Sequence, residues 1–265
     1  MPSGKKAKQQ RRAAAVSGGR KPPPVRSKGG GALARFSRRA LAVAGVAAAV
    51  LVGLGVGLPL ALSSNGSTHD SSAKLAPLST LGHLVAPGPL GPPGPEEPPI
   101  EPGPNLAPAG SPSPGQSVDG IQCQAGEQVA FHIHSRLTIF VNGKSERVPY
   151  GVGIAGPQTQ PGIGVPFVVS GACFSWLHTH AADGIIHIES PVQRVFTLGN
   201  FFDVWGQPLS RTQVGPAQGK VTALFDGKVW LGNPRDIPLQ AHAQIQLEVG
   251  RPLVAPIRLT DWGGL

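Results

Sequence analysis

The chain has 265 residues and a formal net charge of +9, with 37 glycines and 29 prolines, more than one compact domain uses. The charge is uneven, because 12 of the 23 lysines and arginines precede residue 40 and the first acidic residue is Asp70. From residue 40 onward the 14 acidic residues outnumber the 11 basic ones, which excludes a basic nucleic-acid-binding domain there. We therefore expect no nucleic-acid partner.

Residues 1–39 are basic and poor in large apolar side chains. Such a segment cannot build a packed core, so it is expected to be disordered. A tail of this kind can bind nucleic acid or anionic lipid, but a topology signal is the interpretation that the flanking sequence favours. We predict a basic, disordered cytoplasmic tail.

Residues 40–62 carry no charge and are rich in Ala, Val, Leu and Gly. A helix of about 20 apolar residues crosses a bilayer. Basic residues immediately precede this run and none follows until Lys74, so the positive-inside rule places the N-terminus in the cytoplasm. We predict a single transmembrane helix that anchors the chain in the cell membrane. A signal peptide cleaved near residues 61–63 is the alternative.

Residues 63–117 have the composition of a linker, with 13 prolines between Pro77 and Pro114 and a small acidic cluster of Glu96, Glu97 and Glu101. Pro-rich segments adopt extended polyproline-like structure at about 3 Å per residue and act as semi-rigid spacers. The sequence therefore predicts a Pro/Gly-rich linker that holds a domain away from the membrane.

Residues 118–265 read as one extracytoplasmic β domain. Alternating apolar residues and turn dipeptides indicate several short strands. Thr197 to Gly206 reads as a helix with a cap at each end. We predict a mainly β fold, a sandwich or partly open barrel with one short helix. Strands are expected at 131–141, 145–149, 167–170, 241–249 and 257–259, with a hairpin at 221–231 around Asp226-Gly227.

The strand at 131–141 separates its side chains onto two faces. Leu137 and Ile139 fall on an apolar face, and His132, His134 and Arg136 fall on the opposite one. Asn142-Gly143 follows the strand and predicts a two-residue hairpin turn. Likewise, in the strand at 241–249 the alternation puts Ala243 and Leu247 inward and the polar residues between them outward.

Residues 173–189 contain three of the eight histidines and a second turn pair, Asp183-Gly184. A two-residue type I′ turn there would place His180 opposite His187 and His178 opposite Glu189. A four-residue loop would shift this register. Either way, His178 and His180 are two residues apart and share one face of a strand.

The chain has two cysteines, Cys123 and Cys173, both within the predicted external domain. In an oxidising compartment such a pair usually forms a disulfide. A thiolate metal ligand is the alternative, but Cys173 would point to the strand face opposite His178 and His180. We predict a disulfide.

Two His-x-His pairs and one further histidine predict a transition-metal site. Imidazole nitrogens suit zinc, copper and iron. A hydrogen-bonded polar network without a metal is the alternative. The predicted ligands are His132, His134, His178, His180 and His187.

Three segments carry a resemblance to a known group of proteins. They read F-H-I-H-S-R-L-T-I-F-V-N-G-K, L-H-T-H-A-A-D-G-I-I-H-I-E-S-P and F-T-L-G-N-F-F-D-V-W-G. Together they resemble an uncharacterised family of membrane-anchored or secreted bacterial and archaeal proteins, which implies an extracytoplasmic β-rich domain without an assigned activity. The His-x-His pairs are also similar to cupin metal sites, although Glu189 comes too late for the cupin spacing.

Three functions are compatible with this pattern, and whether the protein is an enzyme stays open. It can be a membrane-anchored domain that binds copper, zinc or iron. It can be a metal-dependent envelope enzyme in which Glu189 is the general base. It can also be a non-catalytic module that binds an envelope protein. The sequence favours the first.

Overall fold

The computed structural model describes residues 74–265. The predicted tail at 1–39, the transmembrane helix at 40–62 and the first part of the predicted linker lie outside the described residues. Between residues 74 and 265, no helix has both the length and the apolar character needed to span a bilayer.

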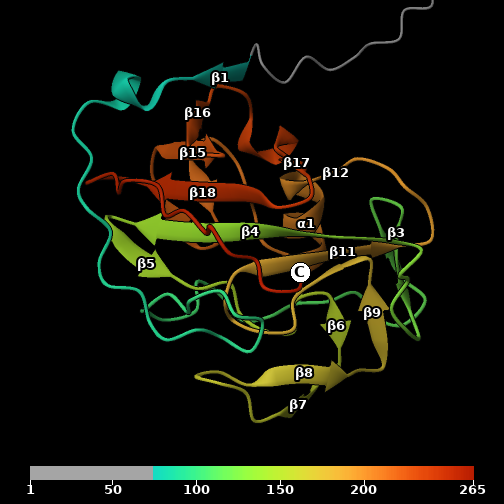
Figure 1. The fold of residues 1–265 in the computed structure, drawn as a ribbon. Coiled ribbons are helices and arrows are strands. Elements are labelled where there is room, and N and C mark those ends of the chain that lie inside the picture. Colours follow the sequence, from blue (N-terminus) through green and yellow to red (C-terminus); the bar gives the residue numbers. More distant parts are fainter. Residues whose placement is uncertain (1–73) are drawn as a thin grey trace, which may run out of the picture. The chain divides into compact units, whose positions relative to one another are not determined.

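An eight-stranded sheet forms the centre of the domain (Figure 1). Its strand order is β1-β16-β15-β18-β4-β11-β10, and β5 pairs with β4 as a side branch. Every pairing is antiparallel except that of β18 with β4. The strands are β1 (Leu75–Ala76), β4 (Phe131–Val141), β5 (Lys144–Glu146), β10 (Leu177–His178), β11 (Ile185–Ser190), β15 (Val221–Phe225), β16 (Lys228–Trp230) and β18 (Ala243–Val249).

Smaller sheets and one α-helix surround this sheet. The smaller sheets pair β2-β3-β9-β6, β7-β8, β12-β17 and β13-β14. Within residues 74–265 the fold is mainly β with one α-helix, as predicted, and the sheets do not close into a barrel. The remaining strands are β2 (Ser117–Val118), β3 (Ile121–Gln124), β6 (Ile154–Ala155), β7 (Gln158–Gln160), β8 (Phe167–Ser170), β9 (Cys173–Ser175), β12 (Phe196–Thr197), β13 (Gln213–Val214), β14 (Ala217–Gln218) and β17 (Pro238–Leu239). The helices are α1 (Leu198–Trp205) and the 3-10 turns Leu78–Leu81 and Pro234–Asp236.

Two hairpins have the predicted two-residue turns. Asn142 and Gly143 adopt φ of 50° and 75°, and Asp226 and Gly227 adopt φ of 49° and 74°. Positive φ at both positions is what a type I′ turn requires, and Asn, Asp and Gly tolerate it best. The turns set the registers of β4 with β5 and of β15 with β16.

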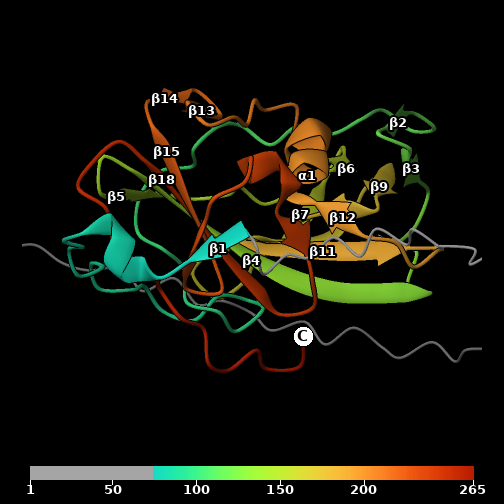
Figure 2. The ribbon, with the colours of Figure 1, turned by 90° about the horizontal axis from the view of Figure 1, so that it is seen from above.

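Helix α1 has the predicted caps. Thr197 and Asn200 form a reciprocal capping box at its start, and Gly206 ends it in the left-handed region with φ of 72°. Phe201 and Trp205 are buried, which anchors the helix in the core. In Figure 2 α1 lies on one side of the sheet and the C-terminal segment lies on the other.

The main core lies between α1 and the face of the sheet that carries Leu137 and Ile139 of β4 and Ile245 and Leu247 of β18. These four side chains are at most 1 % exposed. The predicted alternation of both strands is therefore confirmed on this face, and the other face of β4 is left for polar residues.

The polar face of β18 is not exposed, contrary to the prediction. Gln246 and Glu248 are 3 % and 2 % exposed. The predicted last strand at 257–259 is absent, because glutamine side chains take the place of a strand partner. The amides of Ile257 and Leu259 donate to Oε1 of Gln246 and Gln244, over 3.0 and 2.7 Å. This leaves the C-terminal segment lying across the polar face.

The part of the predicted linker that the structure describes, residues 74–117, is packed against the domain. Strand β1 joins the edge of the main sheet beside β16. Ile100 and Leu106 are buried, and Glu101 forms an ion pair of 2.9 Å with Arg136 of β4. The prediction of a semi-rigid spacer was wrong for this part, because apolar residues among the prolines supply buried contacts.

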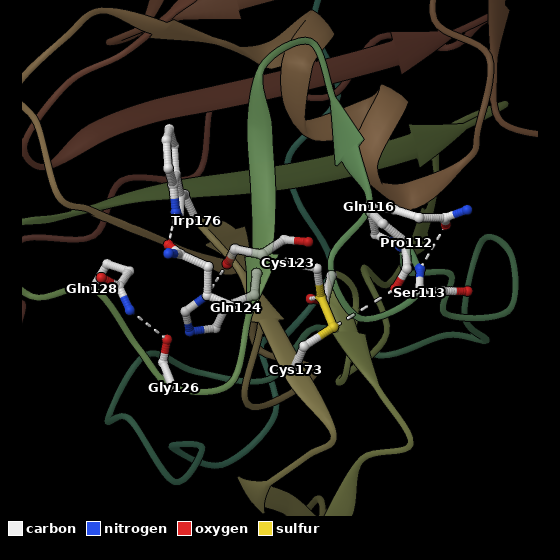
Figure 3. The surroundings of a disulfide bond; sticks show 12 residues. Pro112, Ser113, Gln116, Cys123, Gln124, Gly126, Gln128, Cys173 and Trp176 are labelled. Atoms are coloured by element: carbon white, nitrogen blue, oxygen red, sulfur yellow. Dashed lines mark hydrogen bonds between the residues drawn. A yellow bond between two sulfur atoms is a disulfide. The ribbon is translucent and has the colours of Figure 1, made fainter.

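The predicted disulfide is confirmed. Cys123 of β3 and Cys173 of β9 are bonded, with their Cα atoms 5.4 Å apart (Figure 3). The Trp176 indole also donates to Gln124 Oε1 over 2.6 Å. Both links hold β3 against the segment that leads into β10.

Candidate metal centre

Three adjacent strands bring the histidines together. In the ladder, His187 of β11 lies opposite His178 of β10 on one side and opposite His134 of β4 on the other. Glu189 of β11 lies opposite His132 of β4. Side chains opposite one another or two apart share a face of the sheet. Four histidines and a carboxylate therefore converge on one surface of three strands.

The turn at Asp183-Gly184 has the register of the four-residue loop, the predicted alternative, and the favoured two-residue turn was wrong. His178 lies opposite His187, whereas a two-residue turn would pair it two positions further along β11. Gly184 has φ of 85°, but Asp183 does not have a positive φ. Its carboxylate instead accepts a hydrogen bond from the Ile185 amide over 3.2 Å, which favours a longer turn. A slip of two residues keeps every side chain on its original face, so the histidines still converge.

His178 and His180 face each other through Nε2 atoms 3.0 Å apart. Each ring donates its Nδ1–H to a backbone carbonyl, that of Ser175 over 2.9 Å and that of Val168 over 2.7 Å. A carbonyl oxygen can only accept, so these contacts fix the tautomer in which Nε2 carries a lone pair. Two lone pairs at this distance repel unless a cation lies between them.

The spacing of the nitrogens fits a metal ion. Two ligand nitrogens about 2.1 Å from one ion lie roughly 3.0 to 3.4 Å apart at angles of about 90° to 109°. His132 and His134 have Nε2 atoms 3.0 Å apart, and His134 Nε2 lies 3.2 Å from Nδ1 of His187. These distances, like that between His178 and His180, fall in this range.

The potential ligand atoms form two groups that share His187. Within each group all ligand atoms lie within 4.8 Å of one another. The buried histidine cluster can therefore hold a metal. The first group consists of His178, His180, His187 and Glu189, and the second consists of His132, His134 and His187.

Glu189 lies between the two groups. Its Oε1 is 3.1 Å from both His132 Nε2 and His187 Nδ1, and 4.0 Å from His178 Nε2. The residue is 3 % exposed, and its other carboxylate oxygen is buried without a hydrogen-bond partner. An unpartnered buried carboxylate oxygen is costly, so this atom is suited to bind a cation.

Burial favours the neutral, metal-binding form of two of these rings, His134 and His178. Burial lowers the pKa of His178 well below its usual value, and burial together with the neighbouring imidazoles lowers the pKa of His134 to about 3. Burial also acts to lower the pKa of His187, but hydrogen bonds to Glu189 and Glu96 outweigh it and raise that pKa to about 9. The two carboxylates thus favour positive charge at His187, while burial favours the neutral form of His178 and His134.

Two acidic residues near the cluster were not predicted as site residues. Glu96 Oε1 lies 2.5 Å from His187 Nε2, and Glu127 Oε1 lies 3.3 Å from His180 Nε2. Glu96 belongs to the acidic cluster of the Pro-rich segment, which was the only sequence signal for it. The segment that was predicted to be a spacer therefore supplies a carboxylate to the candidate centre.

No protein-family model, no curated protein and no solved structure matches this chain. The family resemblance carried by the three sequence segments stays a prediction.

Proposed function

We propose that this chain is a membrane-anchored protein whose extracytoplasmic domain binds a transition metal through its histidine cluster. The observation that carries the proposal is the pair of Nε2 lone pairs of His178 and His180, which face each other at 3.0 Å. Backbone carbonyls fix both tautomers, the usual arrangement around metal-ligating histidines. His187 and Glu189 complete a set of four buried ligands.

The chemistry of the ligands limits the choice of metal. Imidazole nitrogens with one carboxylate suit zinc, copper or iron, whereas calcium and magnesium prefer oxygen ligands. Four protein ligands within one group suit a tightly held ion. The proposed cofactor is therefore a transition-metal ion of this set.

Anchoring and location rest on the sequence. The uncharged run at 40–62 and the basic residues before it support a single-pass helix with a cytoplasmic N-terminus. The disulfide is what a domain in an oxidising compartment would contain.

Metal analysis of the purified full chain tests the proposal. After reconstitution with zinc or copper and removal of free metal, the wild-type protein is expected to retain bound metal. The double variant His180→Ala, His187→Ala is expected to lose it from the first group, while His83→Ala, which removes an exposed histidine, keeps it. Wild-type protein that retains no metal would overturn the proposal.

A further inference from the structure

We propose that the cluster is a two-metal centre rather than a site for one ion. The first ion lies among His178, His180 and Glu189, the second lies beside His132 and His134, and His187 belongs to both groups. This inference rests on the proposed function and extends it.

One ion is too small for all the potential ligands. An octahedral ion with bonds of about 2.1 Å holds its most distant ligand atoms roughly 4.2 Å apart. A single site would therefore place all five nitrogens and the carboxylate oxygen within that distance. Instead, among residues 74–265 the ligand atoms meet a limit of 4.8 Å only as two groups. The arrangement provides two positions.

The two positions differ in access. His178, His180 and Glu189 are at most 7 % exposed, so the first position is enclosed. The side chain of His132 is 39 % exposed, and the second group consists of three histidines, to which Glu189 would add a bridging oxygen. Three histidines with a free coordination position characterise metal sites that bind water or a small ligand. The second ion would thus face solvent and exchange its ligand.

Glu189 is built to lie between two ions. Its Oε1 lies 3.1 Å from His132 Nε2 of the second group and 4.0 Å from His178 Nε2 of the first. Its Oε2 is buried and has no hydrogen-bond partner, so this oxygen is available to bind a second cation. A carboxylate with one oxygen for each ion is a common bridge in two-metal sites, whose ions lie about 3.5–4 Å apart.

The local charge also suits two dications. Glu96 Oε1 lies 2.5 Å from His187 Nε2, and its other oxygen is buried without a partner. Glu127 lies beside His180. With Glu189, these residues place three carboxylates around the cluster, and such a concentration of negative charge offsets part of the charge of two ions.

Copper titration of the metal-free full chain tests the inference. Two equivalents of Cu(II) are expected to bind. Because two ions this close are magnetically coupled, the electron paramagnetic resonance signal is expected to account for fewer spins than bound copper. The double variant His132→Ala, His134→Ala is expected to bind one equivalent with one spin per copper.

Two controls separate loss of the site from loss of the fold. His132→Ala alone removes an exposed ring and is expected to weaken the second equivalent at least tenfold without changing the first. His83→Ala is expected to behave as wild type. One equivalent with full spin in the wild-type chain would overturn the two-metal centre and leave the proposed function intact. A chain that binds neither copper nor zinc would overturn both.

Discussion

Leu106 offers a direct test of whether the Pro-rich segment belongs to the folded domain. Its side chain is 7 % exposed and belongs to the main hydrophobic core, although the residue lies in a stretch of sequence that has 13 prolines from Pro77 to Pro114. The Leu106 amide also donates to the Arg147 carbonyl over 2.9 Å, which holds the backbone in place. Leu106→Ala removes the buried contacts and leaves the hydrogen bond.

The expected loss follows from the burial. Removing a buried leucine side chain costs its transfer free energy and leaves a cavity, in total about 2–5 kcal/mol. Since the Leu106 side chain is still 7 % exposed in the folded domain, we expect a loss of about 2–4 kcal/mol. For a domain of this size that corresponds to a fall in Tm of roughly 4–16 °C.

Leu90→Ala is the matched control, because Leu90 lies in the same segment and is 39 % exposed. Thermal and urea unfolding of the two variants and the wild-type chain give the measurement. Leu90→Ala should unfold within about 0.5 kcal/mol of wild type. If Leu106→Ala is equally neutral, residues 74–117 are a free spacer and the packing described for them is wrong.

Three further predictions concern stability. Burial raises the pKa of Glu248 to about 7, so the folded state binds the carboxyl proton more tightly than the unfolded chain does. The resulting contribution to the unfolding free energy is complete below about pH 4.5 and is lost as pH rises through 7. In urea titrations, Glu248→Gln should therefore show a flatter dependence of unfolding free energy on pH, by up to about 3 kcal/mol between pH 5 and 8, and parallel curves would contradict this. The double variant Cys123→Ser, Cys173→Ser opens a disulfide across a separation of 50 residues and should lose about 4 kcal/mol in denaturant unfolding. An unfolding free energy equal to that of the wild-type chain would mean that the disulfide does not constrain the unfolded chain. Thr197→Ala removes the N-cap of α1 and should lower the unfolding free energy by about 1 kcal/mol. Thr197→Ser keeps the hydroxyl and should retain most of this stabilisation, and equal losses in the two variants would exclude a role for the hydroxyl.

The features that could be predicted from the sequence are local ones. The turns at Asn142-Gly143 and Asp226-Gly227 and the caps of α1 depend on residues within four positions of one another. The alternation of β4 could be predicted for the same reason. The convergence of the histidines depended only on which face each side chain occupies, so it survived the wrong register at Gly184.

The features that could not be predicted depend on contacts between distant residues. The high proline content of the Pro-rich segment predicts a spacer, and its few apolar side chains, such as Ile100, give no local pattern that predicts their entry into a hydrophobic cluster. Glu96 reaches His187 across 91 positions, and no local pattern encodes that contact. Asp183 can either enter a type I′ turn or accept a backbone hydrogen bond through its carboxylate. In the structure it accepts from the Ile185 amide, and the two-residue turn does not form.

Anomalous diffraction from crystals of the metal-loaded chain is the most direct measurement of the central claim. Data collected at the absorption edge of the bound metal are expected to show a peak about 2.1 Å from Nε2 of His178 and His180, with a second peak beside His132 if two ions bind. The absence of any peak at the three-strand surface, or a peak only at histidines outside the cluster, would contradict the account.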